Sequence, residues 1–154
     1  MKILGIIPAR YASTRFPGKP MAILGDKTMI ERVYIQSIKS NLTDIVVATD
    51  DERIYKHVKS FGKVMMTGNH HQSGTDRCQE VIEKHADKFD FVVNIQGDEP
   101  FIDPEQINLL ANSLQPETGI ATLIKKVDNP EQLFNPNVVK VVRGLDNRAL
   151  YFSR

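Results

Sequence analysis

The stretch Ile3-Leu-Gly-Ile-Ile-Pro-Ala-Arg-Tyr-Ala-Ser-Thr-Arg-Phe-Pro-Gly-Lys19 decides how this chain folds. Its first part, residues 3–7, has the length and composition of a buried strand, and it stops at Pro8. Its second part is a loop without acidic residues that carries Arg10, Arg15 and Lys19. Guanidinium and ammonium groups bind phosphate oxygens, and ligands of open α/β sheets bind where strands end. The stretch therefore predicts a strand that leads into a loop for a phosphate-bearing ligand. A solvated basic turn is the less favoured alternative.

Length and composition are those of a globular domain. The chain has 154 residues, of which 41% are hydrophobic and 25% are charged. A formal net charge of +1 argues against nucleic-acid or membrane partners. The single cysteine, Cys78, excludes an internal disulfide framework, and the N-terminal apolar run is too short for a membrane span and lacks a signal-peptide pattern. We therefore expect a cytoplasmic protein.

Apolar runs of strand length alternate with helical patterns along most of the chain. Further strands are predicted at residues 45–48, 64–66, 91–95 and 120–124. Helical spacing follows Thr28, Asp51, Gly74 and Asp103, and Asp103-Pro104 is a strong helix start. Residues 138–142 and 149–152 flank a turn and predict a hairpin. The pattern predicts an α/β fold in one domain over residues 1–154: a doubly wound, mainly parallel sheet with an antiparallel β-hairpin extension at the C-terminal end.

A second loop at the predicted sheet edge is Gln72-Ser-Gly-Thr-Asp-Arg77. Its hydroxyls, glycine and arginine stand at a predicted helix N-terminus, where free backbone N–H groups favour anions. N-capping by Ser73 or Thr75 explains the same residues equally well. Capping and ligand binding can coexist, so both interpretations stay open.

A third loop, Gln96-Gly-Asp-Glu99, follows the buried run at 91–95. A carboxylate beside a phosphate loop is well placed for Mg²⁺, which takes oxygen ligands and shares them with substrate phosphates. We favour Asp98 over Glu99 because Asp98 is closer to the strand end. The alternative is that both residues only terminate the strand.

Several common motifs are missing from the sequence. It contains no Gly-x-Gly-x-x-Gly, no P-loop and no Gly-x-Ser-x-Gly elbow, which argues against a dinucleotide-binding fingerprint, a P-loop NTPase and an α/β-hydrolase. His70, His71 and Cys78 do not have the spacing of zinc ligands.

Separated blocks of the sequence resemble the family of 3-deoxy-D-manno-octulosonate (KDO) cytidylyltransferases. The blocks are residues 6–20, 46–50, 71–77, 93–100, 134–142 and 149–154. The resemblance implies a Rossmann-like fold of the nucleotide-diphospho-sugar transferase type. It also implies the reaction CTP + KDO → CMP-KDO + diphosphate with Mg²⁺, which activates KDO for lipopolysaccharide, in a protein that is a homodimer at full length.

Carried over residue by residue, the resemblance implies three groups of site residues. The predicted CTP contacts are Ala9, Arg10, Ser13, Arg15, Lys19, Ser73, Gly74, Arg77 and Gln96. The predicted catalytic residues are Arg15, Lys19 and Asp98. Asp98 is also predicted to be one of the family's two metal-binding aspartates.

Members of the family continue beyond the motif that ends this chain at Arg154. We therefore expect the second metal aspartate, much of the KDO pocket and much of the dimer contact beyond residue 154, and little or no activity from residues 1–154 alone. The rival enzymes are CMP-sialate synthetases, whose opening loop has Lys in place of Arg15 and Lys-Asn in place of Lys19-Pro20, and other sugar nucleotidyltransferases. A non-catalytic CTP-binding fragment is a further alternative, although the retained Arg15, Lys19 and Asp98 favour an enzyme.

Overall fold

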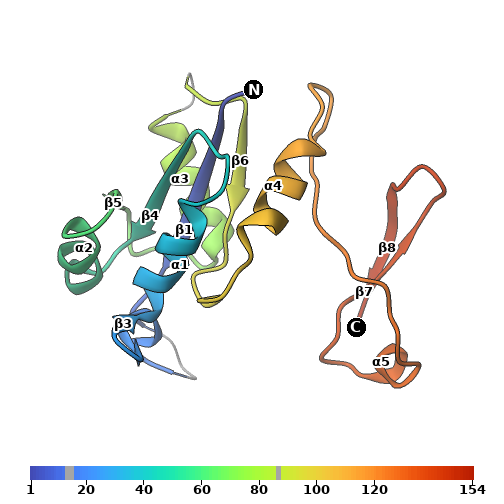
Figure 1. Cartoon of the computed structure of the whole chain (residues 1–154), viewed down its shortest axis with the longest axis horizontal. Coiled ribbons are helices and arrows are strands. Elements are labelled where there is room, and N and C mark those ends of the chain that lie inside the picture. The colour runs from blue at the N-terminus through green and yellow to red at the C-terminus, as the bar shows by residue number, and fades with distance from the viewer. Residues whose placement is uncertain (13–15, 86–87) are drawn as a thin grey trace. The chain divides into compact units, whose positions relative to one another are not determined.

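The computed structural model describes residues 1–12, 16–85 and 88–154 (Figure 1). The chain divides into two compact units, Met1–Thr118 and Gly119–Arg154. The first unit holds the central sheet and its covering helices, and the second holds a short helix and a hairpin. That residues 1–154 act as one nucleotide-binding domain stays a prediction.

Four parallel strands form the central sheet of the first unit. They are β1 (Ile3–Ala9), β4 (Asp44–Thr49), β5 (Val64–Met66) and β6 (Phe91–Asn94), in the order β5-β4-β1-β6. The chain moves outward from β1 to β4 and β5, and then returns to the other side of β1 to form β6. The order therefore reverses between β1 and β6, and in open α/β sheets such a switch point opens a crevice for ligands.

Helices cover both faces of this sheet (Figure 1). One cluster of buried residues joins Ile7 of β1 to α1 (Met29–Ser37), α2 (Glu52–Lys59) and α4 (Pro104–Asn112). The other cluster joins Leu4 and Ile6 of β1 to α3 (Gly74–Glu83). Because side chains alternate between the faces of a strand, the continuous apolar run of β1 supplies both clusters. The predicted doubly wound α/β fold is confirmed.

Side-chain caps start the helices where the sequence places them. The side chains of Thr28, Asp51 and Asp103 accept hydrogen bonds from the first turns of α1, α2 and α4. Before α1 lie a short 3₁₀ helix, η1 (Lys19–Met21), and a small hairpin of β2 (Ile23–Leu24) and β3 (Lys27–Thr28). Among the described residues, no helix is both long and apolar enough to cross a membrane.

The second unit contains α5 (Glu131–Phe134) and an antiparallel pair, β7 (Lys140–Arg143) and β8 (Ala149–Ser153). Its turn includes Asn147 in the left-handed region at φ 65°, a conformation that asparagine tolerates better than most residues. The predicted hairpin extension is therefore confirmed.

Two sequence predictions need correction. The first strand does not stop at Pro8 but runs to Ala9. Ile6 O accepts a hydrogen bond from Ile95 N, so the backbone N and O of Ile6 face β6. Pro8 lies two residues further along the strand and faces the same side, but the pairing of β1 with β6 ends at Ile6. The missing N–H of Pro8 therefore costs no ladder hydrogen bond. Residues 120–124 form no strand; they pair with no neighbouring strand, and Ile120 is 95% exposed.

Candidate active site

A pocket of about 510 Å³ opens at the carboxyl ends of β1 and β6. It is built by the end of β1 with its following loop, the first residue of α3 and the loop after β6. Its lining residues are Pro8, Ala9, Arg10, Ala12, Lys19, Pro20, Gly74, Gln96, Gly97 and Asp98. The pocket has the size of a small-molecule site and lies at the switch point of the sheet, where the fold favours ligand binding.

Glycines bring two of these segments against Pro8. A Cβ at Gly97 would lie 2.7 Å from the Pro8 carbonyl oxygen, and a Cβ at Gly74 would lie 3.2 Å from Pro8 Cγ. The contact at Gly97 is with rigid backbone, so a side chain there has no room. These close approaches fix the floor of the pocket and set the separation between the loops that carry its charged residues.

A cation and a carboxylate meet in the pocket. Lys19 Nζ lies 2.6 Å from Asp98 Oδ2, and the two side chains are 38% and 50% exposed. Lys19 begins η1, directly after Gly18, whose φ of 73° and N–H bond to Tyr11 O (2.8 Å) close the base of the loop after β1. Because both charged groups remain accessible, an incoming phosphate can bind the ammonium while the carboxylate is released for a cation.

Arg10 supplies a second positive charge at the same edge. Its Nη1 donates to Gln72 O over 3.0 Å, so the guanidinium joins the loop after β1 to the loop before α3. This contact is exposed and uses one of the five N–H donors of the guanidinium. The pocket thus offers two cations to a polyanion without a buried uncompensated charge.

The residues of the pocket fit a magnesium ion that is shared with a substrate. Within the described part of the chain, no group of three or more His, Cys, Asp or Glu side chains could hold a metal by itself. Asp98 provides one accessible carboxylate beside the cationic side chains, and Mg²⁺ is often held by one or two carboxylates plus substrate phosphates. This donor set suits a metal that arrives with a nucleotide. Magnesium binding by Asp98 stays a prediction.

The structure brings together six of the residues that the sequence predicts for the site. These residues are Ala9, Arg10, Lys19, Gly74, Gln96 and Asp98. Ser13 and Arg15 lie outside the described residues. Ser73 adjoins the pocket, but its hydroxyl accepts from Asp76 N and its own N–H donates to the Asp76 carboxylate, which forms a capping box. N-capping by Ser73 is therefore confirmed, and its contact with CTP stays a prediction.

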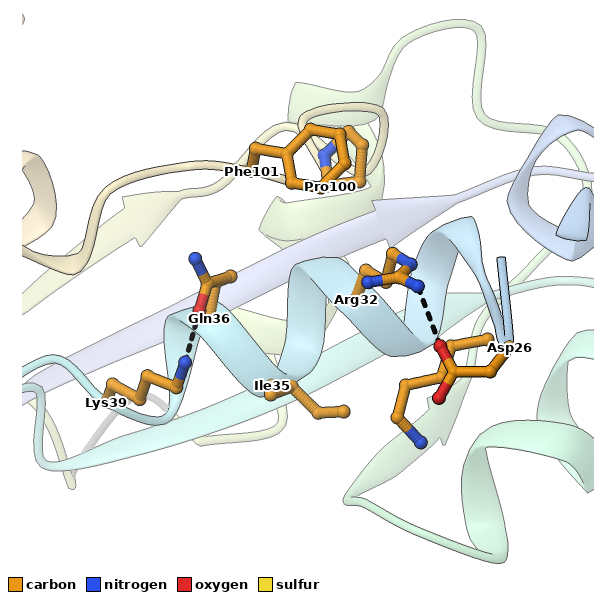
Figure 2. Close-up of a pocket in the computed structure, with 8 residues that line it drawn as sticks. Asp26, Arg32, Ile35, Gln36, Lys39, Pro100 and Phe101 are labelled. Carbon is orange, nitrogen blue, oxygen red and sulfur yellow. Dashed lines mark hydrogen bonds and ion pairs between the residues drawn. The ribbon is translucent and has the colours of Figure 1, made fainter. Parts of the chain in front are cut away.

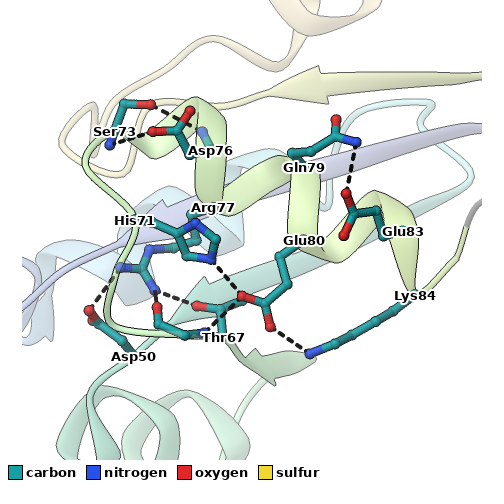
Figure 3. Close-up of polar contacts among 11 residues, drawn as sticks. Asp50, Thr67, His71, Ser73, Asp76, Arg77, Gln79, Glu80, Glu83 and Lys84 are labelled. Atoms are coloured by element: carbon teal, nitrogen blue, oxygen red, sulfur yellow. Dashed lines mark hydrogen bonds and ion pairs between the residues drawn. The ribbon is translucent and has the colours of Figure 1, made fainter.

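Arg77 does not line the pocket, and the structure gives it a different place from the predicted one. Its side chain is 0% exposed, and Nη2 donates to Asp50 Oδ2 over 2.8 Å. Nη1 donates to the Thr67 hydroxyl and to Gly68 O (Figure 3). The enclosed guanidinium joins the start of α3 to the residues that follow β4 and β5. The contact of Arg77 with CTP stays a prediction.

Sequence reasoning missed the partners of Arg77. Asp50 follows β4 directly and Thr67 follows β5 directly, so both lie at the same sheet edge as the three predicted loops. The strand-end rule that selected Arg10 and Asp98 could have selected them too. Glu80 on α3 is a further residue that sequence reasoning missed: its carboxylate accepts hydrogen bonds from Gly68 N and His71 Nε2, in the loop before α3. These contacts depend on how that loop folds back over α3, which no local sequence signal indicates.

A second pocket, of about 280 Å³, lies between α1 and residues 100–101 (Figure 2). Its three cations already have partners: Arg32 donates to Asp26, Lys27 to Glu31 and Lys39 to Gln36. None of the described residues that line it directly follows a strand of the central sheet, so neither its charges nor its position favours a phosphate ligand. The pocket at β1 and β6 is the better candidate.

Comparisons with known proteins show which proteins this chain is similar to. The chain is 54% identical to a 3-deoxy-manno-octulosonate cytidylyltransferase from Cytophaga hutchinsonii and 57% identical to one from Bacteroides thetaiotaomicron, and the matches cover 100% of this chain. The chain spans 62% and 63% of the lengths of these two curated relatives. A solved CMP:2-keto-3-deoxy-manno-octonic acid synthetase complexed with CTP superposes with a TM-score of 0.91 at 40% identity, over 99% of this chain and 64% of that one.

The same family relationship is found independently of any single relative. The family model described as cytidylyltransferase matches residues 4–154, which include every residue that lines the pocket. Residues 1–154 thus carry both the fold and the strand-end pocket, and the chain belongs to the cytidylyltransferase family.

Proposed function

We propose that the full-length protein transfers a cytidylyl group from CTP to KDO and releases diphosphate. The observation that carries this proposal is the pairing of Lys19 with Asp98 in a pocket at the β1–β6 switch point. The names of the relatives support KDO as the acceptor, and the CTP in the solved relative supports CTP as the donor.

The reaction needs alignment and charge stabilisation. The anomeric hydroxyl oxygen of KDO forms a bond to the α-phosphorus of CTP, and the bond from that phosphorus to the oxygen that bridges to the β-phosphorus breaks. Diphosphate leaves with the electron pair, and the proton of the hydroxyl passes to solvent. No protein nucleophile is required, so the residues of the pocket act by binding, orienting and neutralising the phosphates.

Four of the residues that line the pocket have roles in this scheme. Lys19 and Arg10 bind the phosphates and offset the negative charge that builds on their oxygens. Gln96 lies near the nucleotide or the sugar, and Asp98 would hold Mg²⁺. When bound, the ion neutralises phosphate charge and aligns the leaving group. Release of Asp98 from Lys19 would free the ammonium for a phosphate and the carboxylate for the ion.

The proposal extends to the setting of the enzyme. We infer that the reaction takes place in the cytoplasm, supplies activated KDO for lipopolysaccharide, and is carried out by a homodimer of the full-length protein. The 54–57% identity to KDO cytidylyltransferases supports the pathway.

The test is diphosphate release by the full-length protein with CTP and Mg²⁺, and either KDO or sialate as acceptor. We expect CTP- and KDO-dependent turnover and none with sialate. Turnover with sialate alone would assign the rival CMP-sialate activity. Binding of CTP without turnover on either acceptor would leave a non-catalytic CTP-binding protein.

Replacement of Lys19 by alanine tests the role of the pocket. We expect kcat/KM for CTP to fall by about 10²-fold or more, whereas stability changes by no more than about 1 kcal/mol because the Lys19–Asp98 pair is exposed. Lys63→Ala is the matched control, since Lys63 makes a similar surface pair, 2.7 Å from Asp44, away from the pocket. Equal kcat/KM values for Lys19→Ala and Lys63→Ala would refute the assignment.

A further inference from the structure

The segment between β5 and α3, residues 67–73, ends at the pocket. Gly74, the first residue of α3, lines the pocket and lies against Pro8. Gln72 O accepts from Arg10, which also lines the pocket. The conformation of this segment, which we call the 67–73 loop, therefore sets where two walls of the pocket stand.

Glu80 on α3 makes hydrogen bonds to the 67–73 loop (Figure 3). Its Oε2 lies 2.8 Å from Gly68 N and 2.5 Å from His71 Nε2. Its Oε1 lies 2.7 Å from Lys84 Nζ. A carboxylate only accepts, so His71 donates through Nε2, and one side chain fixes the loop at two points that are three residues apart.

The Glu80 carboxylate is well enclosed and charged. Its side chain is 20% exposed and that of His71 is 9% exposed. Hydrogen bonds from His71, Lys84 and Gly68 N lower the pKa of Glu80 from 4.5 to about 2. The carboxylate is therefore ionised near neutral pH, and its hydrogen bonds have the strength of charge-assisted ones.

Arg77 secures the start of the same loop. It donates to Thr67 and Gly68 O, and its pair with Asp50 ties these contacts to the end of β4. The far end of the loop is held by the capping box between Ser73 and Asp76. Between these fixed ends, two side chains of the described residues hold the middle of the loop: Glu80 holds it through His71, and Arg10 holds it through Gln72 O.

We propose that Glu80 and His71 are positioning residues for CTP, which hold the 67–73 loop so that Gly74 and the start of α3 meet the nucleotide. This inference rests on the proposed function, because it assigns a role toward the substrate of that reaction. Neither side chain lines the pocket, so both act through the loop and not by contact.

The side chains around Glu80 do not favour a metal site as the alternative. His70, His71, Asp76, Gln79, Glu80 and Glu83 line a separate hollow of about 420 Å³. Among the described residues, no three potential ligands converge there. Both carboxylate oxygens of Glu80 instead accept hydrogen bonds, Oε2 from Gly68 N and His71 Nε2 and Oε1 from Lys84 Nζ.

The first test compares Glu80→Gln with Glu83→Gln in the full-length protein. Both changes remove one negative charge from α3, but the hydrogen bond of Glu83 joins it to Gln79 on its own helix, over 3.3 Å, and not to the 67–73 loop. We expect Glu80→Gln to raise KM for CTP about tenfold and to change kcat and KM for KDO less than about twofold. Unchanged KM for CTP, or an equal rise in Glu83→Gln, would overturn the proposal.

The second test asks whether the hydrogen bond, and not the imidazole ring, is what matters. His71→Ala removes the donor, whereas His71→Gln keeps an N–H at a similar reach. We expect His71→Ala to raise KM for CTP about as much as Glu80→Gln does, and His71→Gln to recover most of the loss. Equal KM values for the two His71 variants would contradict the proposal.

A readout without substrate separates this inference from the proposed function. Hydrogen exchange at Gly68 N reports the Glu80 contact directly, and exchange there should accelerate at least about tenfold in Glu80→Gln and stay unchanged in Glu83→Gln. If the wild type shows no transfer with KDO, the proposed function fails while the exchange result stands. If exchange at Gly68 is the same in all three proteins, the positioning role fails whatever the activity.

Discussion

The two units of the chain use similar apolar residues to different effect. In Met1–Thr118, buried side chains form one cluster on each face of the sheet. In Gly119–Arg154 no residue is buried, and Ile120 and Leu145 are 95% and 105% exposed. An apolar sequence thus specifies structure where a second layer covers it. Where no layer covers it, local hydrogen bonds such as those between β7 and β8 give the chain its form, and an isolated two-stranded hairpin is marginally stable.

The largest expected difference in stability between two variants comes from truncating one apolar side chain in each unit. Ile7 is 0% exposed in the core of the first unit, so Ile7→Ala should lower the free energy of unfolding by about 2–5 kcal/mol. Leu145→Ala should change it by less than about 0.5 kcal/mol. Urea unfolding measures both.

The control for Ile7 is Ile7→Val, which should cost only about 0.5–1.5 kcal/mol and keeps the comparison measurable if the alanine variant does not fold. A loss above about 1 kcal/mol in Leu145→Ala would show that Leu145 is covered in solution, and the contrast between the two units would then fail.

Next in size is the loss of the partner of a buried charge. Asp50→Asn leaves Arg77, which is 0% exposed, without its carboxylate, and we expect a loss of about 3 kcal/mol. The matched control is Asp44→Asn, which weakens a surface pair with Lys63 and should cost less than about 1 kcal/mol. Thermal or urea unfolding of the two variants decides, and equal losses would show that the buried pair has no special weight.

Most of the first unit could be predicted from its sequence because its signals are local. A few neighbouring residues are enough to recognise the continuous apolar strands, the loops at the strand ends, and the capping residues Thr28, Asp51 and Asp103. The place of the site followed from one rule, that parallel strands end at the same edge, and this rule brought Lys19 and Asp98 together across 79 positions of sequence. Individual contacts such as those of Ala9 and Gln96 were implied by the family resemblance.

The features that the sequence did not predict depend on tertiary neighbours. The extension of β1 through Pro8 depends on where pairing with β6 ends. Burial of Arg77 depends on Asp50 and Thr67, which arrive from two other strands. Residues 120–124 have the composition of a strand, but composition does not supply a partner strand.

Replacing one glycine by alanine in each unit, Gly97 in the first and Gly119 in the second, compares how closely the two units are packed. Gly97→Ala drives a Cβ to 2.7 Å from the Pro8 carbonyl oxygen, so we expect a loss of about 1–3 kcal/mol and a weakened CTP site. Gly119 has no atom within 4 Å of an added Cβ, so Gly119→Ala should be neutral or stabilising by up to about 1 kcal/mol. Unfolding of both variants by urea is the measurement, and a tolerated Gly97→Ala would show that β1 and the loop after β6 can move apart.

The last expected effect concerns the dependence of stability on pH. The pKa of Glu80 is lowered from 4.5 to about 2 by hydrogen bonds from His71, Lys84 and Gly68 N. The unfolded chain binds this proton near pH 4.5, so the stabilisation is complete above that pH and is lost as the pH falls toward 2. Stability of the wild type should therefore decline more steeply over this range than that of Glu80→Gln, which has no proton to bind at this position.

The acid decline should persist in part in Glu80→Gln, because other carboxyls contribute to it. Hydrogen bonds from Arg53 lower the pKa of Asp51, and hydrogen bonds from Ser73 lower that of Asp76. All three carboxyls belong to the first unit, so residues 1–118 account for the acid sensitivity that these shifts predict. Urea unfolding at a series of pH values measures the difference, with Glu83→Gln as the control that should follow the wild type. Parallel stability curves for Glu80→Gln and the wild type would mean that Glu80 does not hold its ionised contacts to the 67–73 loop, and the positioning role inferred for it would lose its basis.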